Sequence, residues 1–451
     1  LGFVHSGQFM TGVRTLATRR SIHTGISPLA AFLLSTAMRV GPGNMIGVTG
    51  AIAAGGPGAL FWMWISAFFG MATAFTEGTL AQIFKEKRGD NFVGGLPFYA
   101  RRLCGNKAWV GVALSALYIF YALMCLPAQG LNVITSLGSI VGLVGGEEIP
   151  LQSTFYYVMS ILLLVFITFM AFGGIKRISR WADILVPVMA VIYIGTAILL
   201  ILTNLGSVPY FFHAVFAGAF KPEAVFGGVL GTALLQGVKR GLMSNEAGQG
   251  TITMAAASAE AHHPCEQGII SALGVFLDTH VICTMTGFII IMAHQWVLNP
   301  EEWKAAGTYP KFLLSIHALT PDLLQTFVMV MVSICFCLFA YTCVMGFVTF
   351  SEISGNRISS STSFITVLRL LCVFVTAFGI ACSIAGYDLS NLWAFSDLAN
   401  IIMVYCNVPM LYLGFRYVRK AAAHYAKNDG TPFTSETIGM KVDYWDERKD
   451  D

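Results

Sequence analysis

The sequence predicts an all-α membrane protein that crosses the bilayer about ten times, in two halves of five spans with opposite orientation. Three observations predict this fold. Of the 451 residues, 56% are hydrophobic and only 11% are charged, whereas about 25% are charged in a typical soluble chain. Apolar runs long enough to cross a hydrocarbon core of about 30 Å recur along the chain. Two of these runs, one in each half, are interrupted by glycine-rich polar stretches.

The amino-terminal stretch is amphipathic and too short to span, so we expect it to lie on the cytoplasmic face. Because the first residue is Leu1 rather than methionine, we expect the sequence to begin inside a longer chain. The expected organisation is an arm at 1–25, a first five-helix repeat at 26–203, an extracellular connector at 204–221, a second repeat at 222–418 and a charged cytoplasmic tail at 419–451. The expected spans are 27–54, 57–84, 108–144 (interrupted at Pro127), 152–173, 181–203, 222–259, 266–297, 321–351, 362–385 and 389–418.

The basic residues agree with this topology. With the arm inside the cell, most Lys and Arg of the loops fall on the cytoplasmic side, and only Lys221, Lys304 and Lys311 fall outside. Five spans per half make the second half enter from the opposite side, as inverted repeats require. A weak internal sequence similarity supports the repeat, because five residue pairs correspond at a constant offset of 201 positions. The pairs are Arg39 with Arg240, Asn44 with Asn245, Gly47 with Gly248, Phe75 with Phe276, and Glu77 with Asp278.

The first break lies in the span 27–54, where Gly41, Pro42, Gly43 and Asn44 interrupt the apolar run. Glycines favour non-helical backbone and proline has no N–H, so backbone groups are freed at membrane depth. Such groups cost several kcal/mol each in hydrocarbon unless they line a polar cavity. The break therefore indicates a site for an ion or a solute, and a proline kink satisfied by neighbouring helices is the structural alternative.

The second break runs from Gly241 to Gly250 and carries Glu246. Paired breaks in two halves are typical of a transporter's binding site. An intramembrane carboxylate is usually paired, and we favour a structural ion pair of Glu246 with Arg39 or Arg240 over direct contact with a solute. Asp278 lies deep in its span and suits a gate, a proton site or a hydrogen bond to broken backbone.

Further polar side chains fall at membrane depth. The amides of Gln129 and Asn132 suit an amino acid zwitterion or bonds between helices. Trp393, with Asp397 after it, could close a pocket or sit at the membrane interface. Thr342 and its neighbours could offer oxygen ligands to sodium, although a threonine bonded to its own helix is the default.

Metal binding and disulfides are not expected. His262 and His263 are adjacent and so do not share a helix face, and no second ligand pair accompanies them. The ten cysteines lack paired spacing and lie mostly in apolar runs, which indicates free, buried thiols. We expect no cofactor beyond a coupling ion.

Several stretches together resemble the alanine or glycine:cation symporter family, whose members have the leucine-transporter fold. They cover nearly the whole chain: RVGPGNMIGVTGAIAAGGPGALFWMWISAFFGMATAFTE, GGLPFYARR, QGVKRGLMSNEAGQG, HPCEQG with GVFLDTHVICT, and WAFSDLAN. The resemblance implies sodium- or proton-coupled uptake of a small neutral amino acid at the plasma membrane, by a protein that acts as a monomer and is not an enzyme.

The resemblance also implies site residues. The substrate would bind at Gly41, Gly43, Asn44, Gln129, Gln236, Asn245 and Trp393, and the cation at Ala37, Val40, Phe339, Thr342 and Cys343. Arg39, Arg240, Glu246 and Asp278 would have structural or gating roles.

The sequence departs from the family pattern at three places. Pro42 stands where the family usually has threonine, Cys343 stands where a hydroxyl residue is expected, and the family's spanning helix before the arm is not in the sequence.

Two other interpretations of the function remain. One is an amino-acid sensor without productive flux, although the tail has no evident signalling module. The other is a membrane-embedded enzyme using Glu246, Asp278 and His280, which no nucleophile motif accompanies.

Overall fold

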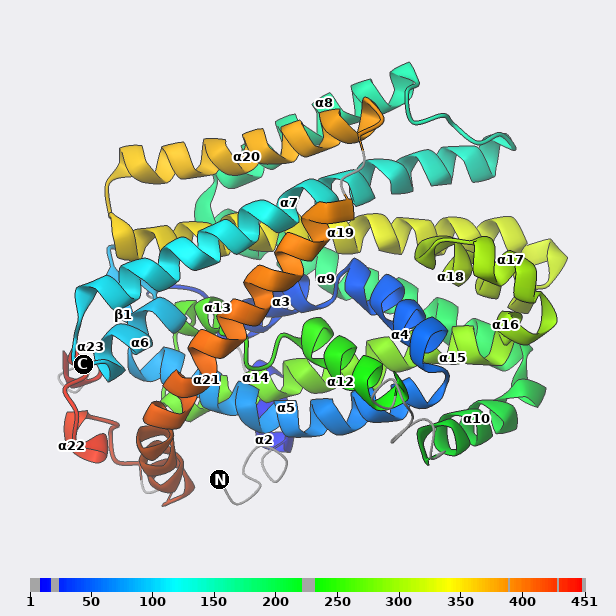
Figure 1. Cartoon of the computed structure of the whole chain (residues 1–451). Coiled ribbons are helices and arrows are strands. Elements are labelled where there is room, and N and C mark those ends of the chain that lie inside the picture. The colour runs from blue at the N-terminus through cyan, green and yellow to red at the C-terminus, as the bar shows by residue number, and fades with distance from the viewer. Residues whose placement is uncertain (1–8, 18–23, 221–231, 388–389, 428–429, 448–451) are drawn as a thin grey trace.

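A computed structural model of the chain describes residues 9–17, 24–220, 232–387, 390–427 and 430–447, and of residues 390–397 it describes the backbone only. The start of the arm, the start of the sixth expected span and Lys221 lie outside the described residues. The described part is built of helices and one short antiparallel hairpin (Figure 1).

The first half contains one broken segment and four longer helices. Its elements are α2 (Phe9–Ala17), α3 (Pro28–Arg39), η1 (Gly43–Gly47), α4 (Val48–Gly55), α5 (Gly58–Ile83), β1 (Glu86–Arg88), β2 (Asn91–Val93), α6 (Leu96–Leu103), α7 (Ala108–Gly145), α8 (Thr154–Ala171) and α9 (Gly174–Thr203). The broken segment is made of α3, η1 and α4, and the four longer helices are α5, α7, α8 and α9.

The second half repeats the scheme and adds short helices between its spans. Its elements are η2 (Leu205–Ser207), α10 (Val208–Phe220), α12 (Thr232–Asn245), α13 (Thr253–Ser258), α14 (Pro264–Val275), η3 (Phe276–Cys283), α15 (Thr284–Ala293), α16 (Gln295–Leu298), α17 (Pro300–Ala305), α18 (Thr308–Leu319), η4 (Asp322–Leu324), α19 (Gln325–Ile358), α20 (Thr362–Ile384), α21 (Ser390–Lys427), α22 (Ser435–Ile438) and α23 (Asp443–Glu447).

The apolar helices make this a multi-pass membrane protein. Within the described residues, eight helices are long and apolar enough to cross a bilayer. The two broken segments are built from shorter helices and are additional to these eight. Large apolar side chains such as Phe169, Val191 and Phe374 are exposed along the outer helices, as lipid contact requires.

Both predicted breaks are confirmed. Helix α3 ends at Arg39, and Val40 is extended before the chain resumes as the π-helical η1. Helix α12 ends at Asn245, and the chain runs without helix until α13 begins at Thr253. In this second break Gly248 and Gly250 have φ values of +92° and +80°, which only glycine adopts without strain.

The expected interruption at Pro127 is wrong, because α7 is one helix from Ala108 to Gly145 with the proline inside it. Neighbouring helices can satisfy the backbone groups that a proline frees in a membrane helix. Here α20 lies directly against the proline: a Cβ atom on Gly379 would approach Pro127 Cβ to 2.2 Å. The glycine therefore provides the space in which the ring is accommodated.

The two ends of the helical bundle differ. The hairpin, α6, α13, α22 and α23 lie at one end, and α10 and α16 to α18 lie at the other (Figure 1). We call these the termini end and the α18 end. The expected tail boundary at 418 falls inside a helix, because α21 continues to Lys427.

The ten cysteines are free thiols, as expected. Four of them, however, are only partly buried: Cys104, Cys337, Cys382 and Cys406.

Candidate functional site

A cavity of about 360 Å³ lies between the two breaks. The first break contributes the backbone of Gly41, Pro42 and Gly43, and the second contributes Ser244 and Glu246. The cavity extends toward the α18 end, where Gly50 of α4 and Thr308 of α18 line it. The remaining lining residues are Met38, Arg39, Ile46, Gly47, Tyr121, Cys125, Gln129, Arg240, Met243, Cys343, Phe347 and Asn400.

Asn44 does not line this cavity, although the sequence places it beside the two glycines. Its side chain is fully buried and points between the two breaks. The Asn44 Oδ1 accepts a hydrogen bond from the Gly41 N–H at 2.8 Å, and Nδ2 donates to Ser244 Oγ at 3.0 Å. Asn44 therefore fixes the first break and ties it to the second, and it positions Gly41 rather than meeting a solute in this state.

Asp278 joins both breaks through one buried carboxylate. Asn44 Nδ2 donates to Oδ1 at 2.6 Å, while Ser244 Oγ donates to Oδ2 at 2.9 Å. The Thr279 hydroxyl also donates to Oδ2, at 2.9 Å. The sequence suggested a bond to broken backbone, but the donors are side chains, one from each break and one from η3 itself.

Arg39 also joins the two broken segments. Its Nε donates to the Asn245 carbonyl at 3.0 Å, and Nη1 donates to the Ser271 carbonyl at 3.2 Å. The favoured ion pair is not made: no ion pair within 4.0 Å among the described residues includes Arg39, Arg240 or Glu246. Two backbone carbonyls, one at the end of α12 and one in α14, take the place of the expected carboxylate.

The other two buried carboxylates are held by separate donors. Glu246 accepts from the Thr251 hydroxyl at 2.5 Å, within its own break. Glu77 of α5 accepts from the Gly250 N–H at 2.9 Å and from Asn407 Nδ2 at 2.5 Å. The Glu77 carboxylate thus holds the second break against α5 and α21. The sequence analysis had noted Glu77 only as the repeat partner of Asp278.

The residues proposed for the cation come together in part. Cys343 Sγ lies 3.8 Å from the Ala37 carbonyl and 3.6 Å from that of Met38. Val40 follows the last residue of α3, and its N–H donates to the Thr36 carbonyl in that helix. The Thr342 hydroxyl donates to the Phe339 carbonyl at 3.1 Å, the default arrangement for a threonine in a helix.

The substrate residues proposed from the resemblance divide into three groups. Gly41, Gly43 and Gln129 line the cavity. Asn245 is buried and closes its own turn by accepting from the Ala247 N–H at 3.0 Å, while Gln236 packs against Gly55, so neither lines the cavity. Trp393 lies outside the residues whose side chains are described.

Several lining residues were not identified from the sequence. Ser244 adjoins Asn245, and its hydroxyl could have been suspected from the break. Asn400 of α21 ends the stretch WAFSDLAN but received no role from it. Tyr121 of α7 carries no local signal, because it lies far from both breaks along the chain. The amide oxygens of Gln129 and Asn400 are buried and have no hydrogen-bond partner in the described structure.

The termini end is packed shut below the cavity. Residues 24–26 pair with the end of α13: the Ile26 N–H donates to Ser258 O at 3.1 Å, and the Glu260 N–H donates to Ile26 O at 2.9 Å. Lys85 Nζ donates to Ala259 O at 2.8 Å, and Gln82 Nε2 donates to the same carbonyl at 2.9 Å. No residue of α13, α6 or the hairpin lines the cavity.

Two histidines of the described residues, His263 and His424, lie side by side. His263 Nε2 lies 3.2 Å from His424 Nδ1. In the parts of the chain with described coordinates, no group of three His, Cys, Asp or Glu side chains is placed to hold a metal ion.

The sequence of this chain is similar to those of known transport proteins. A model of the sodium:alanine symporter family matches residues 1–436. The amino-acid carrier protein AlsT of Bacillus subtilis is 34% identical over 94% of this chain and 86% of its own. The sodium/proton-dependent alanine carrier protein of Bacillus sp. PS3 is 32% identical over 96% and 97%.

Two further comparisons concern an archaeal relative and a solved structure. The sodium/alanine symporter AgcS of Methanococcus maripaludis is 33% identical over 86% of this chain and 82% of its own. The crystal structure of MhsT in complex with L-phenylalanine superposes with a TM-score of 0.62 over 95% of both chains, at 14% identity. This chain therefore has the leucine-transporter fold, as the resemblance implied.

Proposed function

We propose that this chain, which belongs to the sodium:alanine symporter family, carries a small neutral amino acid such as alanine or glycine across the membrane. A sodium ion or a proton would move in the same direction, and the mechanism would be alternating access. The observation that carries the proposal is one cavity bounded by both broken segments, extending to the α18 end while the termini end is packed shut. This is the geometry of one of two alternating states.

The cavity offers complementary groups to a zwitterion. Arg39 lines it, so the substrate carboxylate would lie toward Arg39 and the glycine backbone at Gly41 and Gly43. The substrate ammonium would take acceptor oxygens, and Gln129 and Asn400 present amide oxygens that have no described partner. The proposal keeps function as a monomer, with no cofactor other than the coupling ion.

Coupling to a cation is favoured by the buried charges. Glu77, Glu246 and Asp278 are buried around the breaks, and Arg39 is the guanidinium buried with them. Ionisable groups at membrane depth are costly unless compensated, so a bound sodium ion or a proton would balance the surplus of carboxylates. Sodium would take oxygen ligands such as the Ala37 carbonyl, whereas a proton would go to a carboxylate.

The termini end would face the cytoplasm. Basic residues gather at that end, including Lys85, Arg88, Arg101 and Arg102 near the hairpin and α6. The positive-inside rule assigns this side to the cytoplasm. The cavity would then be reached from outside the cell, as uptake requires.

Uptake into proteoliposomes tests the proposal. We expect radiolabelled alanine or glycine to accumulate under an inward sodium or proton gradient, and not when both gradients are absent. Gln129→Ala should reduce uptake strongly, while His262→Ala, an exposed residue away from the cavity, should leave it unchanged. Binding of the amino acid without any flux would instead favour the sensor, and uptake indifferent to both gradients would remove the coupling.

A further inference from the structure

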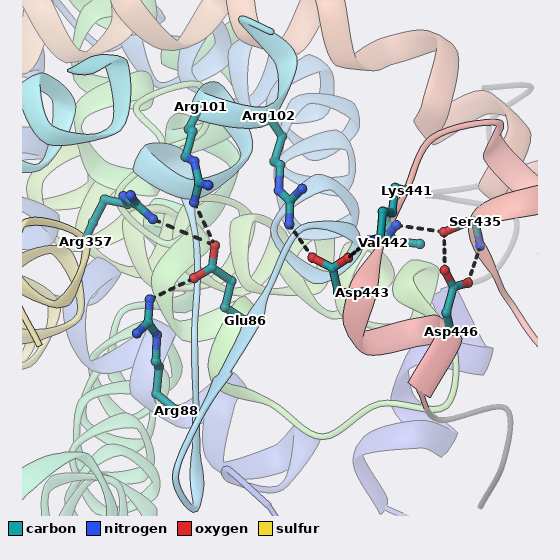
Figure 2. Close-up of polar contacts among 10 residues, drawn as sticks. All are labelled: Glu86, Arg88, Arg101, Arg102, Arg357, Ser435, Lys441, Val442, Asp443 and Asp446. Atoms are coloured by element: carbon teal, nitrogen blue, oxygen red, sulfur yellow. Dashed lines mark hydrogen bonds and ion pairs between the residues drawn. The ribbon is translucent and has the colours of Figure 1, made fainter. Parts of the chain in front are cut away.

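The carboxyl-terminal segment folds back onto the termini end of the bundle. In residues 433–447, the side chains of Phe433, Ile438, Val442 and Trp445 are all at most 3% exposed. The two short helices are joined by Ser435, whose N–H and hydroxyl both donate to Asp446, at 2.8 and 2.5 Å (Figure 2). Helix α23 lies beside β1 and α6 (Figure 1). We call residues 433–447 the tail segment.

The tail segment binds the end of α5 through its aromatic residues. Trp445 Nε1 donates to the Gln82 carbonyl at 2.9 Å. The Lys85 ammonium lies 3.9 Å from the ring centroid of Phe92 in β2, 4.5 Å from that of Tyr444 and 5.4 Å from that of Trp445. An ammonium held over aromatic faces is stabilised by the ring quadrupole, most strongly when it is desolvated, and Lys85 is only 4% exposed.

Gln82 and Lys85 are also the residues that hold the second broken segment. Gln82 Nε2 donates to the carbonyls of Ala256 and Ala259, at 2.5 and 2.9 Å, and Lys85 Nζ donates to Ala259 at 2.8 Å. The tail segment therefore contacts the same two residues that clamp the end of α13, at the main-chain carbonyl of Gln82 and at the side chain of Lys85. Any movement of α13 away from α5 must break these bonds.

An ion pair adds a second attachment. Arg102 Nη2 of α6 lies 2.6 Å from Asp443 Oδ2. Next to it, Arg88, Arg101 and Arg357 all pair with the single carboxylate of Glu86 (Figure 2). Because Glu86 already serves three guanidinium groups, Asp443 supplies the carboxylate that this basic cluster lacks. The pair is exposed, so its contribution is small beside that of the buried aromatic residues.

We propose that the tail segment is a latch that keeps the termini end closed by holding Gln82 and Lys85 in position on α13. The inference rests on the proposed alternating access, in which the path from the cavity to the termini end opens when the α13 end leaves α5 and residues 24–26. Undocking of the tail segment would precede or accompany that opening. Its docking would favour the state whose cavity extends to the α18 end.

Hydrogen–deuterium exchange on the full-length protein tests the latch without requiring transport. Trp445→Ala removes the indole that bonds Gln82, and Ile438→Asp places a charge at a fully buried position, so both should undock the tail segment. The matched control is Trp109→Ala, because Trp109 begins α7 and is 68% exposed. We expect amide exchange in residues 253–259 to accelerate at least tenfold in the two tail variants and to stay unchanged in the control.

The outcomes separate the latch from the transport function. Faster exchange in 433–447 with unchanged exchange in 253–259 would overturn the latch, even if the wild type transports normally. If Trp445→Ala and Ile438→Asp misfold, Asp443→Asn gives a milder test. We expect amide exchange in residues 253–259 to accelerate severalfold in this variant. Unchanged exchange there would overturn the proposal. Absence of uptake by the wild type would overturn the transport function instead, and the exchange result would still decide whether the tail holds α13.

Discussion

Replacing Asn44 with alanine tests whether the two breaks are assembled by side chains rather than by the backbone alone. Asn44 accepts from the Gly41 N–H and donates to Asp278 and Ser244, although it does not touch the cavity. Asn44→Ala should therefore abolish substrate binding through misplacement of Gly41. The control His262→Ala changes an exposed residue outside the cavity and should bind normally.

The magnitude follows from the bonds that are lost. A hydrogen bond to the charged Asp278 contributes about 1.5 to 3 kcal/mol, and a buried Gly41 N–H without an acceptor costs about 1 to 3 kcal/mol. The sum is about 2.5 to 6 kcal/mol, and its lower limit corresponds to roughly 70-fold in affinity. Ser244→Ala removes one bond to Asp278 and leaves Gly41 in place, so the loss of about 1.5 to 3 kcal/mol should weaken binding by roughly 10- to 160-fold.

Calorimetric titration of the purified protein in detergent measures these affinities, with alanine as ligand and sodium present. Gel filtration and thermal unfolding identify variants that have lost the fold. A folded Asn44→Ala protein with wild-type affinity would refute the reasoning, because Gly41 would then hold its position without the amide. Equal effects of Asn44→Ala and Ser244→Ala would show that only the contact with Asp278 matters.

Three further predictions concern other contacts. In Gly41→Ala the new Cβ would approach Cys343 Sγ to 2.5 Å, so uptake should be lost, and adding Cys343→Ala should restore part of it in the same liposome assay. Gly379→Val should lower the thermal midpoint by several degrees, because even the Cβ overlaps the proline ring inside α7; an unchanged midpoint would mean that α20 shifts freely. The hydrogen bond from Arg102 lowers the pKa of Asp443, so the ionised form favours docking and protonation disfavours it. Exchange protection of 433–447 should thus stay constant between about pH 6 and 8 and fall only below about pH 4, and a loss near neutral pH would contradict this assignment.

The sequence predicted the breaks because their residues have few other uses in a membrane span. Two glycines, a proline and an asparagine cannot continue an apolar helix without exposing backbone groups. Pro127 was misleading for the same reason: a lone proline resembles a break, and only the fold reveals that Gly379 makes room for it. The local sequence thus indicates where backbone groups are freed, but not which neighbours satisfy them.

Side-chain direction was less predictable than position. Asn44 and Gly43 are adjacent, yet one points into the protein and the other lines the cavity. Arg39 and Glu246 were expected to pair because their charges are opposite. In the structure, Arg39 bonds a backbone carbonyl, and Glu246 accepts from the Thr251 hydroxyl. The short helices α16 and α17 and the hairpin lie in stretches whose patterns are too brief to predict a structure.

The buried guanidinium of Arg39 has a consequence for how a solute would bind. Carbonyl dipoles hold it in place without cancelling its charge by contact, and its Nη2 has no hydrogen-bond partner in the described structure. Arg39 lines the cavity, so this buried guanidinium keeps one N–H donor unused beside the space that a solute would occupy. A solute that carries a carboxylate or carbonyl oxygen could accept a hydrogen bond from this donor, without displacing the two carbonyls that Arg39 already bonds.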